Sequence, residues 1–149
     1  MQSQCLKEKP FCFLAHHPCF EVKGLGIDLV SPTRIARLIE RYADSSLGLL
    51  FTLNELQYCR LASDPNWAYA VCFGAKEAIG KALATGLAEI DWNEIETNPN
   101  GQQLTVCLHG QARVRAQKLN IQRWFLNWWH LEAYVLVHAV AIGIVKSGE

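Results

Sequence analysis

The stretch from Phe73 to Lys81 places one carboxylate between two lysines in a segment that is otherwise mostly apolar and rich in alanine. Glu77 and Lys81 are four positions apart, so in a helix they share one face, and Lys76 lies beside them. Charged side chains in a buried helix are normally paired with each other or with a ligand. This segment alone leaves two interpretations open: an ion pair one turn apart on a solvated face, or a site for a charged ligand.

A second segment, from Gly24 to Val30, carries a single aspartate, Asp28, among strand-forming residues. An aspartate near the end of an apolar strand is costly to bury, so it usually caps the following turn or binds a ligand. Asp28 and Glu77 together supply the two carboxylates that a magnesium ion commonly takes from a protein, while water and phosphate fill its other positions. Lys76 and Lys81 would then face the phosphate charge. This set of residues is typical of a phosphate-transfer site.

With these residues the chain resembles the holo-acyl-carrier-protein synthase family of 4′-phosphopantetheinyl transferases. The family pattern is Gly-x-Asp at the end of the first strand and, later, Phe-x-x-Lys-Glu-x-x-x-Lys; Gly26-Ile27-Asp28 and Phe73 to Lys81 match it. Between these motifs, Phe51 to Cys59 is similar to the family's threonine-capped helix. After them, Ala82 to Gly86 resembles its Lys-Ala-x-Gly-Thr-Gly stretch, and Asn100-Gly101 falls at its hairpin turn. The resemblance covers roughly residues 22 to 145.

The resemblance implies an enzyme that moves the 4′-phosphopantetheine arm of coenzyme A onto a serine of apo acyl carrier protein. The other product is adenosine 3′,5′-bisphosphate, and the reaction serves fatty acid and lipid biosynthesis. By this resemblance Asp28 and Glu77 hold magnesium, and Lys76, Lys81 and His130 contact coenzyme A. Glu77 and Lys81 are expected to take part in the chemistry, and the general base stays open between Glu77 and a metal-bound water. A structural histidine is the alternative for His130. The family also implies a homotrimer with sites between subunits.

Arg34, Arg37 and Arg41 recur at intervals of three and four positions in the predicted first helix, so they form one basic stripe. Carrier proteins of this class are acidic around the modified serine. The stripe is therefore predicted to steer and orient an acidic carrier protein. Glu40 lies nearby, and an ordinary solvated helix face is the alternative interpretation.

The composition limits other classes of function. Lysines and arginines number 14, as do aspartates and glutamates, and this zero net charge argues against a nucleic-acid-binding protein. The longest apolar run, Tyr134 to Val145, is too short to span a bilayer and is predicted to form a fully buried strand. The N-terminus does not show a charged region, an apolar region and a cleavage site in signal-peptide order, so a cytoplasmic location is expected.

Periodicity, capping and turn signals predict an α+β fold, an antiparallel sheet meander with a long central helix, in agreement with the family. Strand patterns cover residues 20–30, 90–96, 104–108, 121–129 and 134–145. Helices are predicted at about residues 33–42, 53–61, 65–85 and 111–118. A single 4′-phosphopantetheinyl transferase domain is expected over residues 22–146, after an N-terminal extension, residues 1–21, that is expected to be poorly ordered.

Several positions depart from the family pattern. Cys72 stands where an arginine usually precedes the aromatic residue of the motif, and Ala84 replaces a glycine. Asn127-Trp128-Trp129-His130 stands in place of Ser-x-Ser-His, with Tyr134 at the expected spacing. The tryptophans would reshape the adenine pocket or a subunit contact, and core packing is the alternative. These departures motivate a second hypothesis of a different class, a degenerate relative that binds carrier protein or coenzyme A without turnover.

Overall fold

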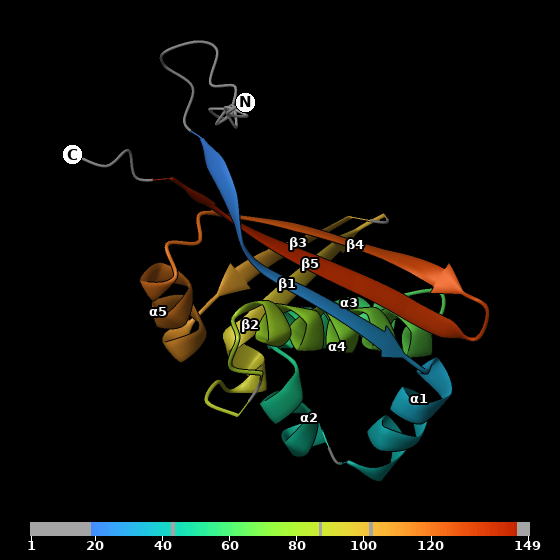
Figure 1. Cartoon of the computed structure of the whole chain (residues 1–149). Coiled ribbons are helices and arrows are strands. Elements are labelled where there is room, and N and C mark those ends of the chain that lie inside the picture. Colours follow the sequence, from blue (N-terminus) through green and yellow to red (C-terminus); the bar gives the residue numbers. More distant parts are fainter. Residues whose placement is uncertain (1–18, 43, 87, 102, 146–149) are drawn as a thin grey trace, which may run out of the picture.

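The computed structural model describes residues 19–42, 44–86, 88–101 and 103–145. One antiparallel sheet of five strands forms a layer, and the long helix α4 (Pro65–Ala82) runs along one of its faces (Figure 1). The predicted α+β class, with a sheet meander and a long central helix, is confirmed. Residues 1–18, most of the predicted N-terminal extension, lie outside the described residues.

The strands are β1 (Phe20–Val30), β2 (Ile95–Asn100), β3 (Gln103–Leu108), β4 (Arg123–Leu131) and β5 (Tyr134–Ile144). Their order is β1-β5-β4-β3-β2, so the first strand of the chain pairs with the last. Strands β2 to β5 follow one another as a meander of antiparallel pairs. In the β1–β5 register, Asp28 lies opposite Val137, near the end of β1 that leads into the first helix.

The other helices are α1 (Pro32–Arg41), α2 (Asp44–Leu50), α3 (Leu53–Leu61) and α5 (Gly110–Lys118), with a 3-10 turn, η1 (Trp92–Glu94). The predicted N-terminal caps are present, whereas α4 ends at Ala82, three residues before the expected end. Thr52 and Glu55 form a capping box at the start of α3, and Asp64 accepts a hydrogen bond from the Trp67 amide at the start of α4. These local signals fix where the helices that carry the charged motifs begin.

Strand β4 lies two residues later than the predicted range, and two further elements differ more. Helix α2 was not predicted, and its buried Leu47 packs into the core. The strand expected to start at Ile90 starts only at Ile95, because residues 92–94 form η1. The Glu94 carboxylate accepts hydrogen bonds from the amides of Gln111 and Ala112, so this turn is held by the start of α5.

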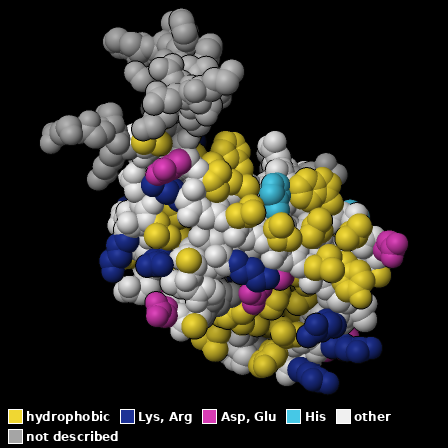
Figure 2. All heavy atoms as spheres, viewed as in Figure 1, with side chains coloured by type: hydrophobic (Ala, Val, Ile, Leu, Met, Phe, Trp, Pro, Cys, Tyr) yellow, Lys and Arg dark blue, Asp and Glu magenta, His cyan; other side chains and the backbone are white. Residues whose placement is uncertain are grey.

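The two faces of the sheet differ in burial. On β5, alternate residues such as Val135 and Val137 are fully buried, whereas the residues between them are only partly buried. The prediction that this segment is fully buried was therefore wrong for one face. That outer face exposes large apolar side chains of β1 and β4: Leu25, Ile27, Leu29, Phe125 and Trp129. Figure 2 shows groups of hydrophobic side chains on the surface of the molecule in one view.

Helix α4 packs so closely against β1 that backbone atoms of the two elements lie next to each other. A Cβ atom on Gly24 would lie 2.0 Å from the carbonyl oxygen of Ala82, and one on Gly26 would lie 1.8 Å from the carbonyl oxygen of Ala78. No other residue type fits at these two positions without moving a strand or a helix. The glycines thus let β1 rest on α4, which brings Asp28, two positions after Gly26, to the charged motif of the helix.

We expect Gly26→Ala to destabilise the protein by about 1–3 kcal/mol or more, because the added methyl group must displace backbone rather than a mobile side chain. The control is Gly48→Ala in α2, where a Cβ would meet nothing within 4 Å. That change is expected to be neutral or to stabilise by up to about 1 kcal/mol through helix propensity. Urea unfolding of both variants tests this contact, and equal midpoints would show that β1 and α4 are not packed this closely.

Candidate active site

Strand β1 and helix α4 bring Asp28, Glu77 and Lys81 together. The Lys81 Nζ atom donates hydrogen bonds to Asp28 Oδ1 at 2.8 Å and to the Ile27 carbonyl oxygen at 2.9 Å. The Asp28 side chain is 17% exposed and that of Lys81 is 47% exposed. The lysine therefore spans from α4 to β1 while its ammonium stays in contact with solvent. The two motifs that are 53 positions apart in the sequence meet here through their charged groups.

Asp28 and Glu77 line one cavity of about 240 Å³. The end of β1, the first turns of α1 and Phe73 of α4 complete its wall. Phe73 in turn stacks on Trp92 of η1, with ring centroids 4.7 Å apart. Neither the stacking partner nor the contribution of α1 was predicted from the sequence, because both depend on how distant segments pack.

The pKa of Glu77 is raised above the ordinary glutamate value of 4.5. Burial is the main cause, because it disfavours the charged carboxylate, and the negative charge of Asp28 adds to it. The positive charge of Lys81 acts in the opposite direction without cancelling the other two effects. Two carboxylates that repel each other in a partly buried cavity are stabilised by a cation bound between them.

The donor set fits a magnesium ion better than a soft metal. Among the described residues, no group of three or more histidine, cysteine, aspartate or glutamate side chains could hold a metal ion. Magnesium often takes only one or two carboxylates from the protein and keeps water and phosphate oxygens as its other ligands. Asp28 and Glu77 provide that number of carboxylates in one cavity. A bound magnesium ion would supply charge neutralisation at a phosphate group.

The raised pKa of Glu77 predicts how the metal-free protein responds to pH. A carboxyl group with a raised folded-state pKa contributes stability that is present below its unfolded pKa and is lost as pH rises through its folded pKa. In buffer with a chelator, Glu77→Gln is therefore expected to melt at a higher temperature than the wild type near neutral pH. The difference in melting temperature should disappear as the pH falls to about 4.5, the ordinary pKa of a glutamate.

Magnesium provides the control for this prediction. If Asp28 and Glu77 hold the ion, magnesium should stabilise the wild type and not Glu77→Gln, because only the wild type keeps both carboxylates. Thermal melts across the pH range, with chelator and with magnesium, measure both effects. A glutamine variant that melts below the wild type at neutral pH in chelator would contradict the stated environment of Glu77.

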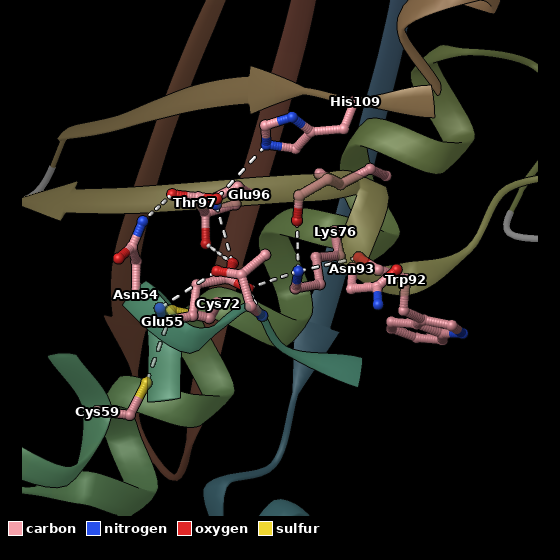
Figure 3. A network of polar contacts seen from close by, with 12 residues as sticks. Asn54, Glu55, Cys59, Cys72, Lys76, Trp92, Asn93, Glu96, Thr97 and His109 are labelled. Atoms are coloured by element: carbon pink, nitrogen blue, oxygen red, sulfur yellow. Dashed lines mark hydrogen bonds and ion pairs between the residues drawn. The ribbon is translucent and has the colours of Figure 1, made fainter. Parts of the chain in front are cut away.

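Lys76 does not reach this cavity. Its side chain is fully buried, and its ammonium forms an ion pair with Glu55 Oε2 at 2.7 Å (Figure 3). Burial lowers the pKa of Lys76, and the negative charge of Glu55 acts against that effect. The expectation that Lys76 contacts a phosphate is therefore not supported by its position, because adjacent residues of a helix project about 100° apart.

His130 lies at a different cavity, of about 310 Å³, between α4 and the far part of the sheet. Its ring lies against the rings of Trp67 and Trp128 at tilted angles, with centroid distances of 4.0 and 5.1 Å. Trp128 also donates a hydrogen bond from Nε1 to the Gly101 carbonyl oxygen, which ties β4 to the β2–β3 turn. None of the residues that line this cavity lines the cavity of Asp28 and Glu77. Within one chain, His130 and the two carboxylates do not form a common site.

The three arginines of the predicted stripe are exposed on α1. They border a shallow surface hollow together with Leu38 and Tyr42. Arg34 also lines the cavity of Asp28 and Glu77, so the basic surface is continuous with the carboxylate site. The sequence predicted the stripe but not this connection.

Cys72 and Trp129, two departures from the family pattern, lie away from the carboxylate cavity. Cys72 is fully buried, with its Sγ atom 3.8 Å from the Sγ atom of Cys59 in α3. Trp129 lies on the outer face of the sheet, where its ring stacks on that of His138 with centroids 5.1 Å apart. Among the described residues, no helix is long and apolar enough to cross a membrane.

The fold and the paired carboxylates agree with one known family of proteins. The family model of the 4'-phosphopantetheinyl transferase superfamily matches residues 24–138, and the chain belongs to this family. The holo-[acyl-carrier-protein] synthase of Koribacter versatilis is 35% identical over 122 residues, which cover 80% of this chain and 97% of that protein.

Solved structures of similar proteins agree. The holo-[acyl-carrier-protein] synthase of Neisseria meningitidis has a TM-score of 0.71 and 29% identity, covering 81% of this chain and 98% of that chain. The Helicobacter pylori enzyme, whose crystal structure holds coenzyme A, shares the fold with a TM-score of 0.66 at 24% identity, covering 78% of this chain and 98% of that chain. The resemblance drawn from the two charged motifs is confirmed.

Proposed function

We propose that this protein is a holo-[acyl-carrier-protein] synthase. It transfers the 4′-phosphopantetheine moiety from coenzyme A to a serine of apo acyl carrier protein, for fatty acid biosynthesis. The observation that carries the proposal is the meeting of Asp28 and Glu77 at one cavity, with Lys81 hydrogen-bonded to Asp28, in a chain of this family. Relatives such as the Koribacter versatilis protein, 35% identical over most of the chain, bear the name of this activity.

The reaction requires positioning and charge neutralisation more than covalent chemistry by the protein. The serine oxygen attacks the β-phosphorus of coenzyme A, the pyrophosphate bond breaks, and adenosine 3′,5′-bisphosphate leaves. In our proposal Asp28 and Glu77 hold magnesium, and the Lys81 ammonium adds positive charge at the phosphates. In this proposal the serine proton passes either to Glu77 or to a water molecule at the site, the two alternatives that the sequence left open.

The test of this activity is incubation with apo carrier protein, coenzyme A and magnesium, followed by intact-mass measurement of the carrier. We expect the mass of the carrier to increase by one phosphopantetheine group. If folded protein binds coenzyme A or carrier but adds no mass to several carriers, the protein is the binding-only relative that Cys72 and the tryptophan pair motivated.

We propose further that the arginine stripe on α1 docks the acidic carrier protein. Arg37 and Arg41 are exposed, and through Arg34 the stripe reaches the carboxylate cavity. A carrier bound to α1 would thus place its serine beside that cavity. Long-range attraction between exposed charges raises the encounter rate and is screened over about 8–10 Å by salt.

We expect Arg37→Glu combined with Arg41→Glu to raise the KM for carrier severalfold or more and to leave the KM for coenzyme A nearly unchanged. Arg34 is kept because it also lines the carboxylate cavity. The control is the reversal of Arg113 and Lys118, which are exposed on α5. Added salt should weaken carrier binding by the wild type much more than by the reversed variant. Unchanged carrier kinetics at low salt would show that the stripe is only a solvated face.

The outer face of the sheet supports a homotrimer, as the family implies. Ile27, Phe125 and Trp129 expose apolar surface that no helix of the described chain covers. Among the described residues, the Nδ1 atom of His138 on the same face is buried without a hydrogen-bond partner. We propose that further copies cover this face, and that the His130 cavity of one subunit then lies near the carboxylate cavity of the next.

A further inference from the structure

Lys76 is the most deeply buried charged group beside the candidate active site, and the proposed reaction does not use it. Its side chain is fully buried. Its ammonium group donates to Glu55 Oε2 at 2.7 Å, to the Trp92 carbonyl oxygen at 3.0 Å and to the Ile95 carbonyl oxygen (Figure 3). An ammonium has three protons, and here three acceptors from α3, η1 and β2 take them. Lys76 therefore connects α4 to three other elements at one point.

The carboxylate of Glu55, which pairs with Lys76, is also held by several hydrogen bonds. Glu55 Oε2 accepts a hydrogen bond from the Thr52 amide, and Glu55 Oε1 accepts from the amide of Thr97 at 2.9 Å and from its hydroxyl at 2.6 Å. Glu55 is therefore held by the start of α3 and by β2 before it meets Lys76. A buried ion pair is often no more stabilising than apolar residues of similar volume, and its best-attested role is to select one packing arrangement over others.

Helix α4 carries Glu77, so the rotation of the helix about its own axis sets where this carboxylate lies. Many of its buried residues after Cys72 are small: Gly74, Ala75, Ala78, Gly80 and Ala82. These small residues let α4 approach β1 to backbone distance. Lys76 adds contacts with α3, η1 and β2 on another side of the helix, where they resist rotation of α4 about its own axis. A rotation of about 20° moves a carboxylate carried about 6 Å from the helix axis by about 2 Å. Such a shift would separate Glu77 from Asp28.

We propose that Lys76 is a positioning residue for Glu77: by fixing the rotation of α4 through Glu55, Trp92 and Ile95, it sets the distance between the Glu77 and Asp28 carboxylates. The two residues are adjacent on α4 and project to different sides, so the rotation that Lys76 fixes determines where Glu77 points. A second link supports this. The ring of Trp92, whose carbonyl oxygen binds Lys76, stacks on Phe73 in the wall of the carboxylate cavity.

The inference rests on the proposed magnesium site, and manganese binding tests it without an activity measurement. The main variant is Lys76→Met combined with Glu55→Gln, which removes both buried charges together and avoids leaving one unpaired. We expect it to fold with a melting temperature near that of the wild type. Its dissociation constant for Mn²⁺, measured by electron paramagnetic resonance, should rise about tenfold or more, as when other groups that orient metal ligands are lost.

Two further variants separate positioning from stability. Ile79→Ala creates a cavity at a fully buried residue of the same helix and leaves the Lys76 contacts in place. It should lower the melting temperature and keep the Mn²⁺ affinity of the wild type. Thr97→Val keeps both charges and removes only the 2.6 Å hydroxyl hydrogen bond to Glu55, so it should weaken Mn²⁺ binding by a smaller factor.

The outcomes are distinguishable. If the wild type binds Mn²⁺ no better than Asp28→Asn does, the proposed metal site is wrong, and the role of Lys76 falls with it. If the wild type binds Mn²⁺ through Asp28 but the folded double variant binds it equally well, the metal site stands and Lys76 is only structural. Should the double variant not fold, Thr97→Val decides, and an unchanged Mn²⁺ affinity for that variant overturns the proposal.

Discussion

Asp28→Asn and Glu77→Gln are each expected to lower the rate of phosphopantetheine transfer by about two to three orders of magnitude. Each change keeps the shape of the side chain and removes one of the two carboxylates at the cavity. The loss would come from missing charge neutralisation at the phosphates, because neither residue belongs to the buried core. Transfer rates measured over a magnesium titration, with circular dichroism to verify the fold, test this expectation.

The control is Asp91→Asn, which removes an exposed carboxylate whose side chain makes no capping hydrogen bond at η1. This variant should transfer at the wild-type rate. The metal assignment would be wrong if either site variant kept near-normal activity when magnesium is limiting.

Phe125→Asp is expected to have the second large effect, because it places a charge on the proposed subunit contact. Phe125 is 54% exposed on the outer face of β4, opposite in direction to the buried Leu126. Burying an unpaired carboxylate in an apolar interface is strongly unfavourable, so the variant should sediment as a monomer. Transfer activity should fall with assembly, since the proposed site draws on two subunits.

Leu53→Asp is the matched control. Leu53 is 84% exposed on α3, on the helical side of the molecule, so the same change there should alter neither assembly nor activity. A wild type that sediments as a monomer at all concentrations, or a monomeric Phe125→Asp variant with full activity, would contradict the shared site.

The proximity of Asp28, Glu77 and Lys81 could be predicted from the sequence because its determinants are local. Asp28 follows two glycines in a strand, and Glu77 and Lys81 are one turn apart on a helix, so each motif has a definite geometry before tertiary packing. The long helix between two cap signals and the meander of alternating strands were predictable for the same reason.

What the sequence did not determine depends on contacts between distant segments. The sequence predicted only that Glu55 belongs to a capping box. In the structure its carboxylate also forms an ion pair with Lys76 and accepts a hydrogen bond from β2. Because Lys76 stands beside Glu77 in the motif, sequence spacing grouped the two together, although the helix turns them toward different elements. The half-buried side of β5 shows the same limit, since an apolar run does not reveal whether a single chain or an assembly covers it.

The most direct test of the central claim is to follow both products of the reaction at once. With apo carrier protein, coenzyme A and magnesium, intact-mass spectrometry measures the modified carrier while chromatography measures adenosine 3′,5′-bisphosphate. We predict that the two appear in equal amounts, that chelation of magnesium stops both, and that Asp28→Asn forms neither at a comparable rate. A folded wild type that releases no adenosine 3′,5′-bisphosphate and leaves the carrier mass unchanged would contradict the proposed function.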